Sequence, residues 1–172
     1  MTGVHVPEHR APEASRAPSG VPWDAFAASA PDLAGAGLAL LDRTGSGRGL
    51  LATVREDAPP RINPVSLRVV DGRLLVFVII GSAKDRDLLE DGRYALHAQW
   101  DPAVPHEFLV RGHVREVDDG AIRDAAISVW PFEADDSYRL FELLVESALL
   151  GERASDEVWP PVYRSWRAPA SG

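Results

Sequence analysis

One stretch of the sequence, residues 73–91 (RLLVFVIIGSAKDRDLLED), constrains the fold more than any other. Residues 74–80 form an unbroken apolar run rich in valine, isoleucine and phenylalanine, which is typical of a buried strand. Gly81 ends the run. Ser82 is followed three residues later by Asp85, a capping-box pattern with aspartate in place of the commoner glutamate, so a helix is expected to begin here. The stretch therefore predicts a strand, a glycine turn and a helix start.

A helix that begins in this way is a candidate anion site. The first backbone N–H groups of a helix have no partner within the helix, and the helix dipole favours negative charge at that end. Lys84, the only lysine of the chain, lies in the first turn. Two interpretations stay open: Lys84 and the helix start bind a phosphate or similar anion, or Lys84 is an ordinary solvated residue.

Length and composition bound the class of protein. The chain has 172 residues, of which 45% are hydrophobic and 26% are charged, values that indicate one ordinary soluble globular domain. We expect a disordered tail rich in proline and alanine at residues 1–20 and a folded domain at residues 21–168.

Charge and cysteine content exclude several functions. The formal net charge of −8 argues against non-specific nucleic-acid binding, which needs a basic face. No apolar run reaches the length of a membrane span, and the N-terminal residues lack the apolar core of a secretory signal. There is no cysteine, so neither disulfides nor thiol chemistry are expected. We therefore predict a cytoplasmic protein that binds neither nucleic acid nor membranes.

Most of the remaining pattern is that of an antiparallel β protein. Alternation and turn signals predict strands at residues 50–55, 61–70, 93–100, 106–117 and 157–167, in addition to 74–80. Short helices are expected to begin near Trp23, Pro31 and Ala121. Residues 138–150 can be read as a helix by propensity or as a strand by alternation. The expected fold class is mainly β, an antiparallel barrel with helical decorations.

The strand at 61–70 has two unusual features. Pro64 removes a ladder hydrogen bond, so we expect an edge or a bulge there. Alternation places Arg61, Asn63 and Val65 on one face and Pro64 and Ser66 on the other. Since both faces carry polar groups, neither is expected to be plain core.

An ordered set of short matches gives the sequence a family likeness. They stand at residues 51–55 (LATVR), 60–66 (PRINPVS), 71–74 (DGRL), 81–84 (GSAK), 91–97 (DGRYALH) and 107–112 (EFLVRG). Taken together, they resemble the pyridoxamine 5′-phosphate oxidase-like group of FMN-binding split barrels. The resemblance implies a six-stranded antiparallel split barrel that forms a homodimer, with FMN at the dimer interface. It also implies that residues 138–150 are a strand.

The resemblance implies roles for nine residues of this chain. Lys84 and Ser82 would hold the cofactor phosphate, with Arg61 nearby. The positions implied to lie along the flavin ring are Asn63, Val65, Ser66, Val78, Ile79 and Glu107.

Several of these positions depart from the oxidase pattern. Val78 and Ile79 stand where the oxidase has a tyrosine and a threonine, and Glu107 stands where it has a glutamine. Ser66 replaces a second phosphate-binding lysine. The C-terminal substrate motif of arginine and histidine is not evident either. The expected function is therefore an FMN-dependent oxidoreductase for a small-molecule redox substrate, and vitamin B6 oxidation is not expected.

Two alternatives stay open. A deazaflavin-dependent reductase would use arginines at the mouth of the same groove, and the candidates are Arg55, Arg61, Arg68 and Arg86. A non-catalytic flavin- or haem-binding carrier or sensor would need an axial ligand in the case of haem, and His97 or His113 are the candidates. The sequence contains no convincing catalytic triad, and we expect no metal site.

Overall fold

The pairing of two strands far apart in the sequence closes the sheet into a barrel. The structure is a computed structural model that describes residues 19–43, 45, 47–55, 58–101, 103, 106–155 and 157–169. The strands are ordered β3-β2-β1-β4-β5-β6-β7, and β3 also pairs with β6. Six antiparallel strands thus form a closed barrel, and β7 extends it along β6. The predicted fold class is confirmed.

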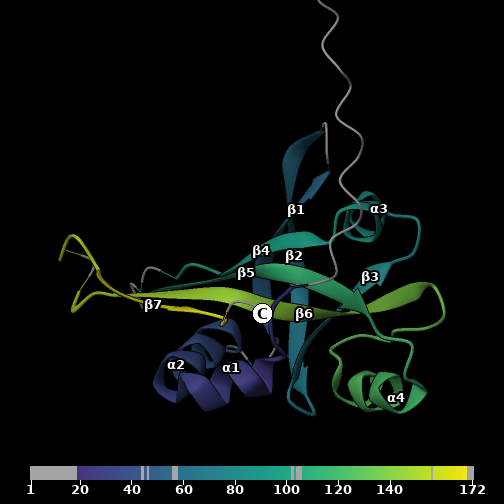
Figure 1. Cartoon of the computed structure of the whole chain (residues 1–172), viewed down its shortest axis with the longest axis horizontal. Helices are drawn as coiled ribbons and strands as arrows, with labels where there is room; N and C mark the ends of the chain where they lie inside the picture. Colours follow the sequence, from purple (N-terminus) through teal and green to yellow (C-terminus); the bar gives the residue numbers. More distant parts are fainter. Residues whose placement is uncertain are drawn as a thin grey trace, which may run out of the picture.

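The elements follow one another along the chain with short connections (Figure 1). They are α1 (Trp23–Ser29), α2 (Pro31–Leu41), β1 (Arg48–Arg55), β2 (Ala58–Val70), β3 (Arg73–Ile79), α3 (Ala83–Glu90), β4 (Arg93–Ala98), β5 (Glu107–Glu116), α4 (Gly120–Val129), β6 (Tyr138–Glu152) and β7 (Val162–Arg167). None of these helices in the described chain is long and apolar enough to cross a membrane. The predicted tail falls outside the described residues except for Ser19 and Gly20.

β3 explains why residues 74–80 are apolar without interruption. Leu74, Val76 and Val78 belong to the core cluster inside the barrel, which also receives α1 and α2. Leu75 and Phe77 point the other way, into a second cluster beneath α4. Since successive side chains of a strand point to opposite faces, a strand covered on both faces is apolar at every position.

Residues 138–150 form a strand, as the family resemblance implies. β6 pairs with β5 along most of its length, and on its other side with β3 first and with β7 later. Phe141 and Leu143 fill the barrel, whereas Leu140 lies in the cluster under α4. Pairing with three strands outweighs the local helix propensity.

β2 differs from expectation in two respects, its first residue and the place of its irregularity. It begins at Ala58, three residues before the predicted start. Pro64 lies opposite Leu50 in continuous register, and the irregularity in this pair of strands lies between Thr53 and Arg55. The bulge considered at Pro64 is therefore wrong. Its proline is tolerated because β3 pairs with β2 only from Leu67 onward, so Pro64 is on an open edge.

The expectation that neither face of β2 is core also needs correction. Val65 and Leu67 are buried in the barrel core. Only the first half of that face, with Arg61 and Asn63, is polar and half-buried. The strand changes character along its length because its second half is inside the closed barrel and its first half is not.

Two buried carboxylates attach α3 to the barrel. Asp87 accepts hydrogen bonds from the Thr53 hydroxyl on β1 (2.9 Å) and from Arg61 on β2 (2.6 and 2.7 Å). Asp85 accepts from Nε of Arg139 on β6 (2.9 Å). Burial by itself raises the pKa of the Asp87 carboxyl, but the bonds from Arg61 and Thr53 outweigh it and hold the pKa below its ordinary value.

The first prediction concerns two glycines of α2 and tests core packing. A Cβ on Gly37 would lie 2.3 Å from the Phe108 ring, whereas a Cβ on Gly35 meets nothing within 4 Å. Gly37→Ala should lower the free energy of unfolding by about 1–3 kcal/mol through overpacking. Gly35→Ala should raise it by about 0.5–1 kcal/mol, since alanine is the better helix former. Urea unfolding of both variants measures the difference, and equal effects would contradict the packing described.

The second prediction concerns Asp87 and pH. Asp87→Asn should cost about 1–3 kcal/mol of unfolding free energy at pH 7, because the charged partner of Arg61 is lost. A carboxyl with a lowered folded pKa stabilises the protein above its unfolded pKa of about 3.9, and this contribution is lost as pH falls through the folded value. The difference in unfolding free energy between wild type and Asp87→Asn should therefore become smaller below about pH 4.

Glu90→Gln provides the control for this experiment. Glu90 is on the same helix, but its carboxylate is exposed and lies 3.8 Å from Arg55. Its removal should change the free energy of unfolding by less than about 0.5 kcal/mol at either pH. A gap between Asp87→Asn and wild type that stayed constant with pH would contradict the role assigned to the ionised Asp87.

Candidate functional site

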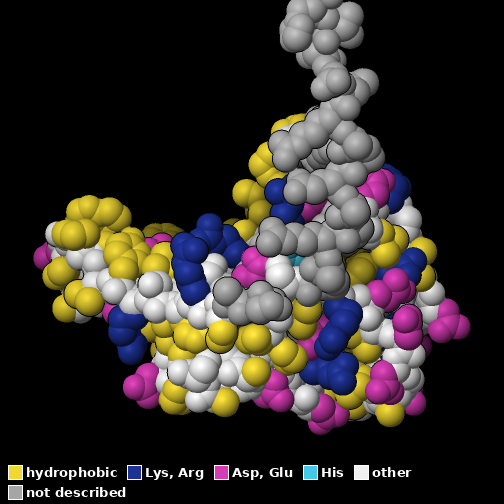
Figure 2. All heavy atoms as spheres, viewed as in Figure 1, with side chains coloured by type: hydrophobic (Ala, Val, Ile, Leu, Met, Phe, Trp, Pro, Cys, Tyr) yellow, Lys and Arg dark blue, Asp and Glu magenta, His cyan; other side chains and the backbone are white. Residues whose placement is uncertain are grey.

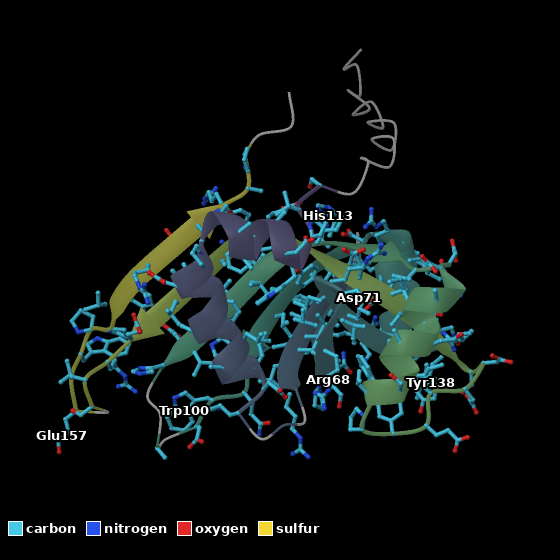
Figure 3. All side chains as sticks on the ribbon, turned by 90° about the horizontal axis from the view of Figure 1, so that it is seen from below. Arg68, Asp71, Trp100, His113, Tyr138 and Glu157 are labelled. Atoms are coloured by element: carbon cyan, nitrogen blue, oxygen red, sulfur yellow. The ribbon has the colours of Figure 1, made fainter. Side chains whose placement is uncertain are left out.

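A large open groove lies where β2 separates from β3. Its volume is about 860 Å³, within the range of small-molecule and cofactor sites. Four parts of the fold contribute to it: the edges of β1 and β2, the end of β3 with the start of α3, the loop after β4, and the segment that leads into β6. Trp100 and Tyr138, which line it, lie along the edge of the barrel opposite His113 (Figure 3).

The start of α3 forms one end of the groove and has the local structure that its sequence predicts. Gly81 adopts a φ of 75°, which turns the chain from β3 into the helix. The Ser82 side chain accepts a hydrogen bond from the Asp85 N–H (3.2 Å). The Asp85 carboxylate accepts in return from the Gly81 N–H (2.8 Å), one residue earlier than a standard capping box has it.

This arrangement leaves two backbone donors without a partner beside the groove. Within the described chain, the N–H groups of Ala83 and Lys84 donate to no protein acceptor. Both residues line the groove. Unpaired N–H groups at a helix start, with the positive end of the dipole, are a favourable environment for an anion.

Lys84 supplies a positive charge without a counter-ion at the same place. It is half-buried, and no described residue forms a hydrogen bond or ion pair with it. Burial lowers the pKa of its ammonium group, because the charged form loses hydration. Arg48, at the start of β1, also lines the groove without a described partner. An anionic group bound here would restore the interactions that these two cations lack.

The opposite part of the groove is apolar and aromatic. Phe77, Phe132 and Tyr138 contribute to it, with the Phe132 and Tyr138 ring centroids 5.2 Å apart and Phe77 and Tyr138 6.5 Å apart. Phe77 is braced from behind by Trp130 at 4.8 Å. Trp100 and Leu50 complete the apolar surface. A ligand with an anionic end and a planar ring system fits this division.

Six of the nine predicted site residues line this groove. They are Asn63, Val65, Ser66, Ile79, Ser82 and Lys84. They come from two strands and a helix start that are separated in sequence. The prediction that they contact a cofactor remains a prediction, but the fold brings the six together.

The other three do not line it. Arg61 is directed at the buried Asp87 carboxylate, as described above. The Val78 side chain is 1% exposed and lies inside the barrel, because only every second residue of β3 faces outward. Glu107, on β5, lies near His97, with 3.8 Å between Glu107 Oε2 and His97 Nε2.

The groove also contains residues that sequence reasoning missed. They are Arg48, Gly49, Leu50, Pro64, Phe77, Ala83, Gln99, Trp100, Phe132 and Tyr138. Arg48 lies in the glycine-rich segment 42–49, which carries no recognisable phosphate-binding motif. Phe132 and Tyr138 flank the start of β6, whose position depends on its pairing with β3. No local signal connects them with α3.

The comparisons with known proteins agree with this architecture. No protein-family model matches the sequence, and the comparison with curated proteins finds no match. Among solved structures, a heme-binding protein from Mycobacterium smegmatis aligns with a TM-score of 0.58 at 17% identity. The alignment covers 77% of this chain and 57% of that protein, so this chain spans little more than half of its length.

Two smaller proteins align over most of their length. General Stress Protein 26 from Bacillus anthracis gives a TM-score of 0.54 at 18% identity, covering 77% of this chain and 97% of that one. A protein from Listeria innocua assigned to the pyridoxamine 5′-phosphate oxidases gives 0.52 at 16% identity, covering 64% and 91%. Identities this low show the fold alone. The chain therefore has the split-barrel fold of the pyridoxamine 5′-phosphate oxidase-like proteins.

Proposed function

We propose that the groove binds FMN and that the protein is a flavin-dependent oxidoreductase acting on a small-molecule redox substrate. The observation that carries the proposal is Lys84, a half-buried cation without a described partner at the capped start of α3. Bound FMN would supply the electron-transfer chemistry, and the chain would bind it, orient it and limit its contact with water.

The phosphate of FMN matches the charged end of the groove. Ser82, the N–H groups of Ala83 and Lys84, and the Lys84 ammonium group are all donors. Arg48 adds a second positive charge on the β1 side. Hydrogen bonds between ionised groups are roughly twice as strong as neutral ones, so this end would contribute much of the affinity.

The flavin ring matches the apolar and aromatic part of the groove. Val65, Ile79, Trp100 and the Phe132–Tyr138 pair offer apolar and aromatic contact. The Asn63 and Gln99 side chains line the same space and carry amide donors and acceptors suited to the polar edge of the ring. Few polar groups among apolar walls are typical of cofactor sites.

The rim of the groove supports the proposal of a homodimer. Three large apolar side chains at the rim are exposed: Leu50 by 41%, Ile79 by 54% and Trp100 by 58%. A second copy of the chain placed over this rim would bury them and cover the bound cofactor. We therefore propose that FMN lies at the interface of a homodimer.

The deazaflavin alternative has less support. All four of its candidate arginines already have partners: Arg55 with Glu90, Arg61 with Asp87, Arg68 with Asp42, and Arg86 with the Gly81 carbonyl. Among the described arginines, Arg48 is the one that lines the groove without a described partner. A long acidic tail would require existing ion pairs to break.

The haem alternative finds no ligand in the groove. One neighbour in fold is a heme-binding protein, but none of the described residues that line this groove is a histidine. His97 Nδ1 lies 2.5 Å from the Ala98 carbonyl oxygen, and His113 Nδ1 lies 2.5 Å from Glu146 Oε1. These bonds leave Nε2 of each ring as the atom that could bind iron, but neither histidine lies in the groove, so a haem bound in the groove would lack an axial ligand from this chain.

Lys84→Ala tests the phosphate end directly. The variant should bind FMN more weakly by about 1–3 kcal/mol, because a charge-assisted hydrogen bond to phosphate is lost. Riboflavin, which has the ring but no phosphate, should bind wild type and variant equally. Fluorescence quenching titrations with both ligands measure the two affinities.

Arg86→Gln serves as the matched control for charge. Arg86 is on the same helix but bonds to the Gly81 carbonyl and does not line the groove. Its FMN affinity should fall much less than that of Lys84→Ala. Unchanged FMN affinity in Lys84→Ala, or an equal loss for riboflavin, would reject the phosphate assignment.

Turnover distinguishes an enzyme from a carrier. In air, where dioxygen reoxidises the reduced flavin, the FMN-loaded protein should oxidise a reduced nicotinamide at a rate well above that of free FMN, as followed by nicotinamide absorbance. Tight FMN binding without such turnover, and without turnover of reduced deazaflavin, would instead indicate a flavin carrier or sensor.

A further inference from the structure

A second hollow lies on the outer face of the sheet, away from the groove. It has a volume of about 510 Å³ over β1, β4, β5 and β6, and it joins a smaller one of about 180 Å³ over β5, β6 and β7. The two share Arg111, Ser147 and Arg167. No residue of this hollow lines the first groove. His113, at its margin, marks the opposite edge of the barrel from Trp100 and Tyr138 (Figure 3).

Strand register places the three shared residues in one row. Arg111 on β5 lies opposite Ser147 on β6, and Ser147 lies opposite Arg167 on β7. Directly opposed residues project from the same face of a sheet, so both arginines and the serine point outward together. With strands about 4.8 Å apart, the two arginines stand about 10 Å apart with the hydroxyl between them.

The row continues with small residues, which is why there is a hollow. Ala95 on β4 lies opposite Arg111, and Ala52 on β1 lies opposite Ala95. Long side chains at these positions would fill the space over the sheet. Instead the two guanidinium groups border a depression whose floor is made of short side chains.

Most basic side chains of the described chain are paired, but two of those at this hollow are not. Among the described residues, four basic side chains have no hydrogen-bond or ion-pair partner: Arg48, Lys84, Arg111 and Arg167. Two of them line the first groove and two line this hollow. In a chain of net charge −8, carboxylates to pair with are plentiful. Figure 2 shows basic side chains in several places on this face of the molecule, some of them over β5, β6 and β7.

The neighbouring charged groups of the hollow are already satisfied. Arg93 forms a bidentate pair with Asp91 (2.5 and 2.6 Å). Glu146 lies outside the Arg111–Ser147 register, in a bulge of β6, and its carboxylate bonds to Ser19 and His113. The Arg111 and Arg167 guanidinium groups therefore remain available to a ligand.

Packing fixes the end of β7 and with it Arg167. The preceding residue, Trp166, packs against Phe26 with ring centroids 4.8 Å apart. The following residue, Ala168, donates its N–H to the Glu146 carbonyl (2.8 Å). Arg167 is thus attached between two anchored neighbours, so little backbone entropy would be lost when it binds a ligand.

We propose that Arg111, Ser147 and Arg167 form a second anion site, specific for the phosphate monoester group of a small molecule. A phosphate presents three acceptor oxygens in different directions, which suits two guanidinium forks and a hydroxyl between them. A carboxylate has only two oxygens in one plane and would satisfy one fork. The proposal does not depend on what the first groove binds.

Titration with inorganic phosphate in the Lys84→Ala background tests this site, because that background removes the Lys84 charge from the first groove. Calorimetry at constant ionic strength should show one phosphate site. Arg111→Gln and Arg167→Gln, each added to that background, should weaken phosphate binding about tenfold or more. Ser147→Ala should weaken it a few-fold, through loss of one neutral hydrogen bond.

Arg164→Gln is the matched control, since it removes the same charge from the same strand. Arg164 pairs with Glu152 (2.8 Å) and lines neither hollow. The phosphate affinity of this variant should stay within about twofold of that of the Lys84→Ala protein. A charge outside the site acts on the phosphate only at long range, where salt screens it. Thermal unfolding without phosphate checks that each variant is folded.

Two results would overturn the proposal. The first is that phosphate binds to the Arg111→Gln and Arg167→Gln proteins as tightly as it binds to the Arg164→Gln protein. The second is the absence of any phosphate binding in the Lys84→Ala protein. Weaker FMN binding in Lys84→Ala concerns only the first groove, so the two proposals fail or succeed separately.

Discussion

The pairing of β3 with β6 is the interaction on which the rest of the structure depends. It joins residues about 65 positions apart, Val76 with Phe141 for example, and converts a twisted sheet into a barrel with a single interior. The same pairing puts Tyr138 next to Ile79, at the place where β3 ends and α3 begins. The pairing that closes the barrel therefore also builds this wall of the groove. Without this pairing, the aromatic wall of the groove would not be held in a fixed position relative to the start of α3.

The groove exists because the first half of β2 pairs with β1 alone and leaves its other edge without a strand. Ala58 to Ser66 pair with β1, and β3 pairs with β2 only from Leu67 to Val70. The open half carries Pro64, which could not donate to a neighbouring strand there, and it presents Asn63 and Ser66 to the space that results. The fold therefore produces a polar edge beside an apolar wall. That contrast is what a ligand with both an anionic and a planar part requires.

Charge pairing gives the most direct indication of where ligands bind. Most described arginines are held by carboxylates or carbonyls, and Arg61 shows how complete that can be: its guanidinium is bound by a buried aspartate. The cations left over lie at two hollows on opposite edges of the barrel. Because exposed ion pairs contribute little to stability, leaving the exposed arginines among them unpaired costs the fold little, and the anions proposed above would pair with them.

Local sequence by itself determined the units that depend on near neighbours: the strand, glycine and capped helix of residues 73–91, with Lys84 in the first helical turn. The resemblance to the split-barrel group, which draws on the whole sequence, named six residues that the groove brings together. Only the tertiary structure decided that residues 138–152 form a strand and that Arg61 bonds to Asp87 and not to the groove. It likewise decided that Val78 faces the core, and that Phe132 and Trp100, which are far apart in the sequence, line the same groove. The physical reason is that capping and turn formation act over a few residues, whereas strand partners, burial and ion pairs are selected by contacts between distant segments.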